Sequence, residues 1–454
     1  MEQKVYELLE SYGEEITETL KRWVRIPSVL GEAEEGAPFG RDTRRMLDTA
    51  MADARRMGFD VRDFDGYACD ITMGDQEEKI AVLGHLDVVP VGDGWTRPPF
   101  EGVQEGRRVY GRGTEDDKGP CIAALYAMRA IRESGIPLKK RGIRMILGCS
   151  EETEWKDMAY YKAHTEMPEM GFSPDASFPV INTEKGLLHL ELRFENPRNG
   201  LQVLEMAAGD RVNVIPGFCT ALIAGGEELA EKVRAWGEKT GLPVSAETVE
   251  RGVQVTTEGI PGHSANPEGR RNAIGMMVCL MKELGAEGGL RTLAEAVGME
   301  HDGKGLGCAC SDEVSGALTC NMGILRLTEG EWTATLDFRC PMTADPQKIR
   351  ETAEAHLPGI AVEVTELKPA HHVPAEGELV TELLAAYEEE SGLKGETIAI
   401  GGGTYAKALK QGVAFGVLFP DETELAHQAD ESIHLDSLMK AARIYANSLI
   451  RLCR

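Results

Sequence analysis

The stretch KIAVLGHLDVVP, residues 79–90, holds a continuous apolar run that ends where the polar side chains His85 and Asp87 appear. A second apolar run, GIRMILG at residues 142–148, follows a helical pattern over Lys118–Ser134. Continuous apolar strands are typical of a sheet buried on both faces, and their alternation with helices is typical of parallel pairing. We therefore predict an α/β fold with a mostly parallel sheet sandwiched by helices.

The hydrophobic pattern changes near residue 186. The segment GLLHLELRFEN, residues 186–196, alternates apolar and polar side chains, as a half-exposed antiparallel strand does. Four more alternating segments follow, and helical patterns lie among them at Glu227–Lys239, Asn272–Leu284 and Pro346–His356. This mixture predicts a separate α+β domain with a four-stranded sheet.

The first pattern returns at about residue 375. A helical stretch at Leu379–Ser391 precedes the apolar runs TIAIGGG and VAFGVLF, and a last helical pattern covers Leu435–Leu452. This order predicts one discontinuous domain with a second domain inserted into it. The predicted bounds are residues 1–185 and 375–454 for the discontinuous domain and residues 186–374 for the insert.

The composition is that of an acidic globular protein. Charged residues make up 27% of the 454 residues, and the net charge is −26. An acidic surface repels nucleic acid and anionic membranes, so neither is an expected partner. No apolar run approaches the roughly 20 residues that a membrane-spanning helix needs. The ten cysteines are scattered without a paired CxxC spacing, which suits a reducing compartment, so we expect a cytoplasmic protein.

Side chains able to bind metal ions follow the ends of the predicted strands of the first domain. Loops beyond the carboxyl ends of parallel strands share one crevice, so we expect these side chains to meet. Crowded carboxylates repel one another, and bound cations reverse that cost. Histidine and carboxylate ligands suit Zn²⁺, and a site rich in oxygen also accepts Mn²⁺ or Co²⁺. The residues concerned are His85, Asp87, Asp116, Asp117, Glu151, Glu152, Asp175 and His427.

Taken singly, most of these groups have simpler interpretations. Asp175 after Ser-Pro is more often a turn residue, Asp117 alone is more often solvated or a helix cap, and His427 alone is uninformative. The pair His85 and Asp87 says more, because alternate strand residues can point the same way and the carboxylate can orient the imidazole. Together the groups favour a two-metal site over a coincidence of short motifs.

Several motifs resemble those of a known family. GHLDVVP, GRGTEDDKGP, SEETEW, SPDASFP, PGHSANPEGRRNA and GGGTYAK resemble motifs of the two-metal exopeptidases of the aminoacylase, carnosinase and bacterial dipeptidase group. The segment His85–Phe100 is similar to the HxDVVPxGxGWTRxPF pattern of the dipeptidase V (Xaa-His dipeptidase) branch. The resemblance runs over essentially the whole chain, and it implies a zinc-exopeptidase-like catalytic domain with the insert as a lid domain.

The resemblance also implies a set of metal ligands. Asp116 is expected to bridge two divalent ions, and it is preferred to Asp117 because the ligand of the family lies three residues before the glycine of DDKG. Asp87 is expected to orient His85 as a neighbouring partner. The remaining ligands are His85 and Asp175 for one ion, and Glu152 and His427 for the other.

The adjacent glutamates of SEET then have different expected roles. Glu152 binds metal, while Glu151 faces the water held between the two ions. The ions lower the pKa of that water, and Glu151 takes its proton as a general base before passing it to the leaving amine.

The insert supplies the expected substrate contacts. By resemblance, His263 of IPGHSANP stabilises the tetrahedral oxyanion, although without the family it is only a loop histidine. Asn213 and Arg339 match residues that hold the terminal carboxylate of the substrate, and a strand-end salt bridge is the competing interpretation of Arg339. The glycine run with Gly402 and Gly403 precedes a predicted helix whose N-terminal amides can cradle a carboxylate.

These expectations describe a metallopeptidase. It is expected to hydrolyse dipeptides or short peptides with a free C-terminal carboxylate. The WTRPPF segment and the large insert favour this over the alternative of an N-acyl-amino-acid deacylase. A non-catalytic peptide-binding relative is a third possibility, but binding alone does not require a base such as Glu151 beside the metals. A dehydrogenase is disfavoured because the glycine run lacks the G-x-G-x-x-G fingerprint. We expect a monomer.

Overall fold

The computed structural model describes residues 2–197 and 199–454 and divides the chain into two compact units. Unit 1 comprises Met1–Asn182, His372–Ile398 and Gly403–Arg454, and unit 2 comprises Thr183–His371 and Ala399–Gly402. The domain bounds that we predicted from the sequence remain a prediction, separate from this division into units. Among the described residues, no helix combines the length and the apolar character needed to cross a membrane.

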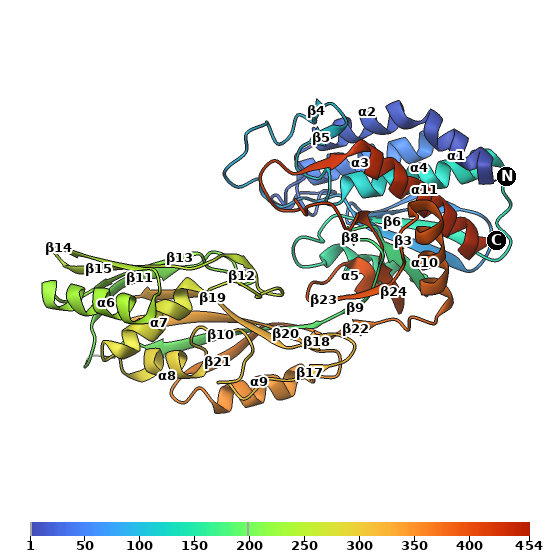
Figure 1. The fold of residues 1–454 in the computed structure, drawn as a ribbon. Helices are drawn as coiled ribbons and strands as arrows, with labels where there is room; N and C mark the ends of the chain where they lie inside the picture. The colour runs from blue at the N-terminus through green and yellow to red at the C-terminus, as the bar shows by residue number, and fades with distance from the viewer. Residues whose placement is uncertain (1, 198) are drawn as a thin grey trace. The chain divides into compact units, whose positions relative to one another are not determined.

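Unit 1 contains a large sheet with helices around it (Figure 1). Its helices are α1 (Glu2–Ser11), α2 (Gly13–Val24), α3 (Arg41–Arg56), α4 (Lys118–Ser134), α5 (Lys156–His164), α10 (Glu378–Ser391), α11 (Leu435–Cys453) and the 3₁₀ turn η1 (Tyr405–Ala408). The strands of the sheet are β1 (Asp60–Phe64), β2 (Ala68–Met73), β3 (Lys79–His85), β6 (Gly142–Gly148), β7 (Met170–Ser173), β9 (Val180–Glu184), β22 (His371–His372), β23 (Thr397–Ile400) and β24 (Gln411–Ala414). Shorter pairings join β4 (Val103–Glu105), β5 (Arg108–Tyr110) and β26 (Ser432–His434), and β8 (Ala176–Ser177) with β25 (Val417–Leu418).

The centre of this sheet is parallel. The strand order is β1-β2-β6-β3-β7-β24-β9-β22, with β23 paired to β9. Strands β6, β3, β7 and β24 pair in parallel, whereas β1, β2 and β9 pair with their neighbours in antiparallel fashion. The predicted α/β class with a mostly parallel sheet is confirmed.

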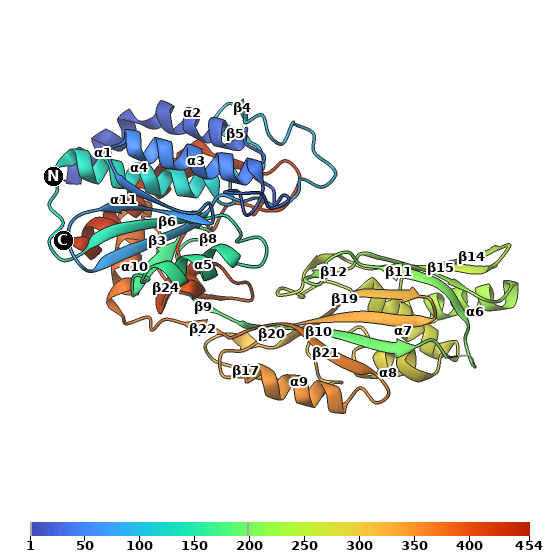
Figure 2. The same cartoon turned by 180° about the vertical axis from the view of Figure 1, so that it is seen from behind.

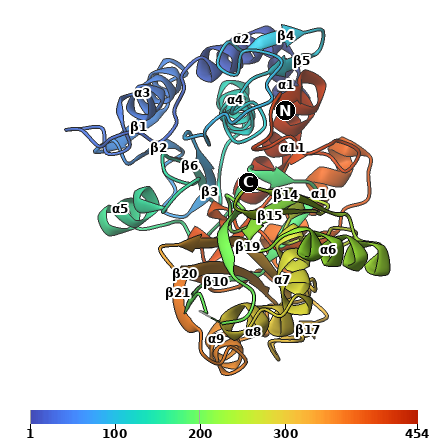
Figure 3. The same cartoon turned by 90° about the vertical axis from the view of Figure 1, so that its left-hand side faces the viewer.

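Both faces of the central strands are buried, as their continuous apolar sequence requires. Ile80 and Val82 of β3 belong to the hydrophobic core formed with α3, α4, α10 and α11, while Ala81 and Leu83 belong to a smaller core with α5 and η1. Figures 2 and 3 show α3 and α5 on opposite sides of β2 and β6.

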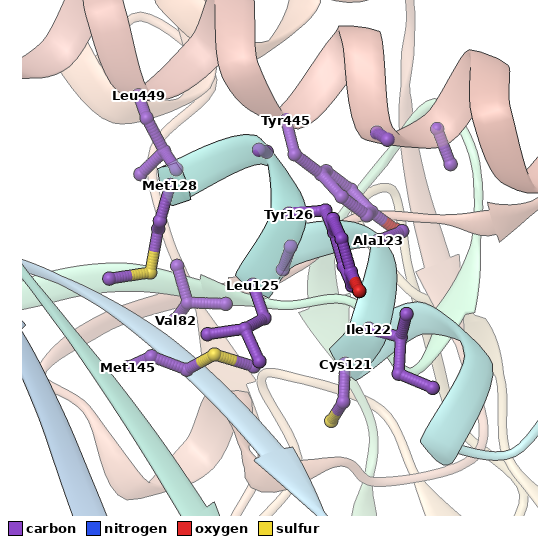
Figure 4. Close-up of a cluster of buried hydrophobic side chains, with 14 of the residues drawn as sticks. Val82, Cys121, Ile122, Ala123, Leu125, Tyr126, Met128, Met145, Tyr445 and Leu449 are labelled. Carbon is purple, nitrogen blue, oxygen red and sulfur yellow. The ribbon is translucent and has the colours of Figure 1, made fainter. Parts of the chain in front are cut away.

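Helix α4 is the centre of the larger core. Figure 4 shows Leu125 and Met128 of α4 between Val82 and Met145 of the sheet and Leu449 of α11. The helix ends at Gly135, whose φ of 77° lies in the left-handed region that only glycine adopts without cost. Its first residue, Lys118, directly follows Asp116 and Asp117, so the packing of α4 fixes the place of both aspartates.

Unit 2 contains an antiparallel sheet of eight strands, and not of the four that we predicted. The strands, in sheet order, are β14 (Val244–Val249), β15 (Gly252–Glu258), β13 (Phe218–Ile223), β11 (Val203–Ala208), β19 (Thr319–Thr328), β20 (Glu331–Cys340), β10 (Gly186–Glu195) and β21 (Ala361–Lys368). The strands missed from the sequence are β11, β14 and β19. Strand β19 is buried on both faces over its first half, and β11 and β19 carry register shifts, so neither strand alternates cleanly.

Helices cover one face of this second sheet (Figure 1). They are α6 (Glu227–Thr240), α7 (Ala273–Glu283), α8 (Gly288–Ala296) and α9 (Pro346–Ala355), and two small pairings join β12 (Val214–Ile215) to β16 (Gly262–His263) and β17 (Ser311–Asp312) to β18 (Gly316–Ala317). Leu188, Leu190 and Leu192 of β10 point into the core under these helices. The alternate residues, including His189, therefore lie on the opposite face.

Candidate metal centre

The carboxyl edge of the parallel strands of unit 1 gathers the predicted metal ligands. His85 is the last residue of β3 and pairs with Gly148, the last residue of β6. The turn with Glu151 and Glu152 follows β6 after two residues, and Asp175 follows β7 after one residue. Because these strands run in parallel, their ends bring the three segments to one edge of the sheet.

Asp116 lies between two histidines. Its Oδ1 is 2.9 Å from Nε2 of His85, and its Oδ2 is 2.9 Å from Nε2 of His427. Glu152 approaches the second histidine, with 2.9 Å between Oε1 and Nε2, and Asp175 approaches the first, with 3.6 Å between Oδ2 and Nε2. The five predicted ligands therefore form two groups that share the carboxylate of Asp116.

The donor set fits divalent cations. Nε2 of His85 and Oδ1 of Asp116 are buried and 2.9 Å apart, yet neither atom takes part in a hydrogen bond of acceptable geometry. A cation satisfies such a pair of lone-pair donors, whereas a buried polar atom without any partner is costly. Ligand atoms of His85, Asp116 and Glu152 lie within 4.8 Å of one another, as do those of His85, Glu151 and Asp175.

The electrostatics of the cluster point the same way. Burial raises the pKa of Glu151 far above its usual range, and burial together with the charge of Asp116 raises that of Glu152 to about 7. Burial opposes ionisation of Asp116 as well, but the close contacts with the imidazoles of His427 and His85 outweigh it and hold its pKa well below the usual range. Burial lowers the pKa of His427, but the close contacts with Asp116 and Glu152 outweigh burial and raise it to about 11. So many buried carboxylates remain ionised together only if positive charge is added.

Asp87 holds the turn that carries the two glutamates. Its carboxylate accepts hydrogen bonds from the backbone amides of Glu151, at 3.2 Å, and Glu152, at 3.1 Å. The closest contact of Nδ1 of His85 is with the backbone carbonyl oxygen of Asp87, at 3.0 Å, and the carboxylate lies 3.4 Å away. Asp87 therefore contacts His85, and it also fixes the backbone of Glu151 and Glu152.

Two further residues of this centre, Asp157 and Tyr405, were missed from the sequence, and Asp117 supports the centre without facing the histidines. Asp157 accepts hydrogen bonds from the amides of Cys149 and Ser150 and from the hydroxyl of Tyr405. Asp117 accepts hydrogen bonds from the amide of His85, at 3.0 Å, and the thiol of Cys121. Asp157 lies two residues after SEETEW and Tyr405 lies within GGGTYAK, but neither position indicated a contact.

The remaining predicted residues belong to unit 2, apart from Gly403. His263 ends β16, and its Nδ1 accepts a hydrogen bond from the amide of Ala265. The backbone carbonyl of Asn213 accepts a hydrogen bond from the amide of Ser264, which holds Asn213 beside the His263 turn. The helix predicted after Gly402 and Gly403 is wrong, because only the four-residue 3₁₀ turn η1 follows the glycines. So short a turn has no helical N-terminus to cradle a carboxylate.

Arg339 is paired through a buried aspartate that the sequence did not reveal. Nε and Nη2 of Arg339 donate to Asp337, and Nη1 donates to the carbonyl of Gly401 at 2.8 Å. Asp337 also accepts a hydrogen bond from the hydroxyl of Ser264, the neighbour of His263. Of the five N–H groups of a guanidinium, these contacts use three and leave two. The D-x-R spacing on one face of β20 was the available signal.

The chain is similar to known proteins in sequence and in fold. The model of a family described as Peptidase family M20/M25/M40 matches residues 81–451. Putative dipeptidase YtjP of Bacillus subtilis (strain 168) is 36% identical over 455 residues, which cover 97% of this chain and 98% of that protein. Beta-Ala-Xaa dipeptidase of Lactobacillus delbrueckii subsp. lactis is 32% identical over 461 residues, which cover 99% of this chain and 98% of that protein. The crystal structure of human carnosine dipeptidase 1 has a similar fold, with a TM-score of 0.62 and 14% identity over 100% of this chain and 98% of that chain.

Proposed function

The chain belongs to peptidase family M20/M25/M40, and from this premise we propose how its residues carry out the metal-dependent hydrolysis of dipeptides. The observation that carries the proposal is the placement of Asp116, whose two carboxylate oxygens each lie 2.9 Å from the Nε2 atom of a different histidine. A carboxylate in this position is suited to bridge two ions.

We propose a centre for two divalent ions. Asp116 is the shared ligand, His85 and Asp175 hold one ion, and Glu152 and His427 hold the other. Zinc matches this mixture of imidazole and carboxylate ligands, and manganese and cobalt are the alternatives. Elemental analysis of the purified protein, expected to give two metal ions per chain, tests the count.

Bound divalent cations supply Lewis acidity, which lowers the pKa of a water molecule and polarises the peptide carbonyl. Glu151 accepts the proton of the attacking water while the oxygen of that water bonds to the carbonyl carbon. It then donates this proton to the amine nitrogen as the carbon–nitrogen bond breaks. Asp87 keeps Glu151 in place for both transfers by accepting its backbone N–H.

Residues of unit 2 bind the substrate in this proposal. The free N–H groups of Arg339 suit the terminal carboxylate of a peptide, because a guanidinium presents paired donors to both oxygens. Asp337 keeps the guanidinium oriented, so the salt bridge of Arg339 supports this role. Asn213 adds an amide donor, Gly402 and Gly403 allow close backbone approach, and His263 donates to the oxyanion of the tetrahedral intermediate.

A deacylase of N-acyl-amino acids remains the second candidate, because it uses the same cluster and the same carboxylate contact. We favour a dipeptidase of the dipeptidase V branch, on the strength of the WTRPPF segment and the similarity to a Beta-Ala-Xaa dipeptidase. The test is a panel of β-alanyl dipeptides, Xaa-His dipeptides and N-acetyl-amino acids. Metal-stripped protein with Zn²⁺, Mn²⁺ or Co²⁺ added is expected to hydrolyse the dipeptides faster. A preference for the N-acetyl-amino acids selects the deacylase.

We further propose that the protein acts in the cytoplasm as a monomer. The acidic composition and unpaired cysteines suit that compartment. Light scattering on the protein as it elutes from a size-exclusion column measures its molar mass. A mass twice that of the 49.5 kDa chain contradicts a monomer.

A further inference from the structure

Two loops of unit 1 each bury a glutamate against the other. The aspartate loop, residues 111–117, carries the bridging Asp116, and the histidine loop, residues 424–431, carries His427. Glu115 of the first loop binds the backbone of the second, and Glu431 of the second binds the backbone of the first. Neither glutamate is a proposed metal ligand, and neither is the proposed general base.

Glu431 is fully buried and holds the aspartate loop. Its Oε1 accepts hydrogen bonds from the amides of Gly113 and Glu115, both at 2.9 Å, and of Asp116, at 3.2 Å. Its Oε2 accepts a hydrogen bond from Nη1 of Arg112 at 2.7 Å. One carboxylate thus fixes the backbone on which the bridging ligand is mounted.

Glu115 holds the histidine loop in return. It is 8% exposed, and its Oε1 accepts hydrogen bonds from the amides of Leu425, at 2.9 Å, and Ala426, at 3.0 Å. His427 comes next, with φ of 64° and a side chain that is 42% exposed. Packing does little to fix so exposed a ligand, so the backbone bonds from Glu115 take on that task.

We propose that Glu115 and Glu431 are positioning residues that couple the geometry of Asp116 to that of His427. This inference rests on the proposed two-metal centre. Each glutamate sets the affinity for the ion whose ligand it holds in place. Glu115 controls the ion held by Glu152 and His427, whereas Glu431 controls both ions, because Asp116 is shared.

The side-chain chemistry separates two substitutions at each position. In Glu115→Gln the amide oxygen still accepts the bonds from Leu425 and Ala426, so we expect metal binding close to that of the unaltered protein. In Glu115→Ala both bonds are lost. In Glu431→Gln the NH₂ group of the new side chain replaces one of the two carboxylate oxygens. This NH₂ group then faces either Arg112 or the three backbone amides, which are all hydrogen-bond donors. The isosteric change is therefore expected to impair metal binding.

The experiment is a titration of metal-stripped full-length protein with Zn²⁺ in competition with a chelating dye, which yields two binding constants. We expect Glu115→Ala to weaken one of them about 10–100-fold, the range typical of losing a partner that orients a ligand, and to leave the other within about twofold. Glu431→Gln is expected to weaken both. The absorption spectrum of the Co²⁺-loaded variants, which reports coordination geometry, provides a second readout independent of activity.

Glu422→Ala is the matched control. Glu422 also binds a backbone amide, that of Phe419, but it contacts neither loop backbone and is expected to leave both constants unchanged. Thermal unfolding of the metal-free variants separates a folding defect from a binding defect. Equal binding constants in Glu115→Ala and the unaltered protein overturn the inference, as does equal damage from Glu115→Gln and Glu115→Ala. If the unaltered protein binds fewer than two ions, the proposed function fails first.

Discussion

At the scale of single residues, neighbouring side chains of the same type make different contacts in the metal centre. Glu151 and Glu152 are neighbours in one turn, and both backbone amides bind Asp87. Only Glu152 lies against His427. Asp116 and Asp117 divide in the same way, since Asp116 faces the histidines and Asp117 binds the amide of His85. The sequence suggested these roles through resemblance alone, because spacing does not reveal which of two adjacent carboxylates turns toward a site.

The two glutamates are expected to respond differently to the same substitution. Glu151→Gln removes the proton acceptor while the proposed ligands stay, so kcat is expected to fall about 10²–10⁴-fold with little change in metal content. Glu152→Gln replaces an anionic ligand, so metal content is expected to fall and excess metal to restore part of the activity. Measuring the metal content and kcat of each variant tests this assignment of roles to Glu151 and Glu152. Metal loss in Glu151→Gln alone reverses the assignment.

The carboxylate contact proposed for Arg339 predicts a strong dependence on the C-terminus of the substrate. Replacing the free carboxylate of a dipeptide by an amide is expected to cost on the order of 2–5 kcal/mol in kcat/KM, as for a buried charge pair that loses one partner. Arg339→Ala is expected to remove that discrimination, measured as the ratio of kcat/KM for acid and amide. Equal rates for acid and amide with the unaltered enzyme contradict the assignment.

At the scale of helices and strands, the elements that position the centre were the easiest to predict. Strands β3 and β6 and helix α4 have strong apolar patterns, and the predicted α4 and β6 match the observed bounds. Strands β11, β14 and β19 were missed because edge placement, register shifts and burial on both faces erase the alternation. The glycine run also misled, since glycines before a polar segment do not reveal whether a helix follows.

The end of α4 offers a test of backbone conformation with an internal control. Gly135 has φ of 77° and open space around its Cα, so Gly135→Ala meets no clash but is strained. We expect the free energy of unfolding to fall by about 1–2 kcal/mol, the cost of the left-handed region for an L-residue. Gly13, at the start of α2, also has open space but no positive φ, so Gly13→Ala is expected to be neutral or slightly stabilising. Chemical unfolding compares the two, and equal effects contradict the conformational argument.

Three neighbouring strands of unit 2 share a pH-dependent contact. Burial lowers the pKa of His189 on β10, but Asp337 on β20 and Glu366 on β21 outweigh burial and raise it above its usual value. The same two carboxylates also bind Arg339 and Lys368, respectively. A histidine with a raised pKa stabilises the folded state fully below about pH 6.5, its unfolded pKa, and loses that contribution as the pH rises through the folded pKa.

We therefore expect the free energy of unfolding to decline above about pH 6.5, and to decline less in His189→Gln. Urea unfolding at a series of pH values from about 6 to about 9 measures both slopes. Identical slopes for the two proteins show that His189 does not titrate with folding.

At the scale of the whole molecule, the sequence predicted the fold class and the gathering of ligands from residues far apart in the chain. His85 and His427 are separated by more than 300 positions, yet both lie against Asp116. What the sequence lacked was the network that supports them, namely Asp157, Tyr405, Glu115 and Glu431. Their hydrogen bonds join loops whose approach depends on the finished fold, and no local pattern encodes that.

Removal of metal is expected to affect both activity and stability. A strong chelator should abolish hydrolysis and lower the unfolding temperature, because cations that bind only the folded state stabilise it and their loss leaves buried carboxylates to repel one another. Activity and calorimetry before and after addition of Zn²⁺ measure the two effects. Full activity in protein shown to be free of metal contradicts the proposed centre.

The position of β24 within the large sheet has a consequence for synthesis on the ribosome. This strand lies between β7 and β9 but comes from residues 411–414, after the chain has passed through unit 2. A nascent chain therefore presents an open, hydrogen-bonding edge at β7 while residues 174–410 are added, a delay of about 10–50 s at common translation rates. Unpaired edges attract other strands, so this interval is when the growing chain depends most on chaperones.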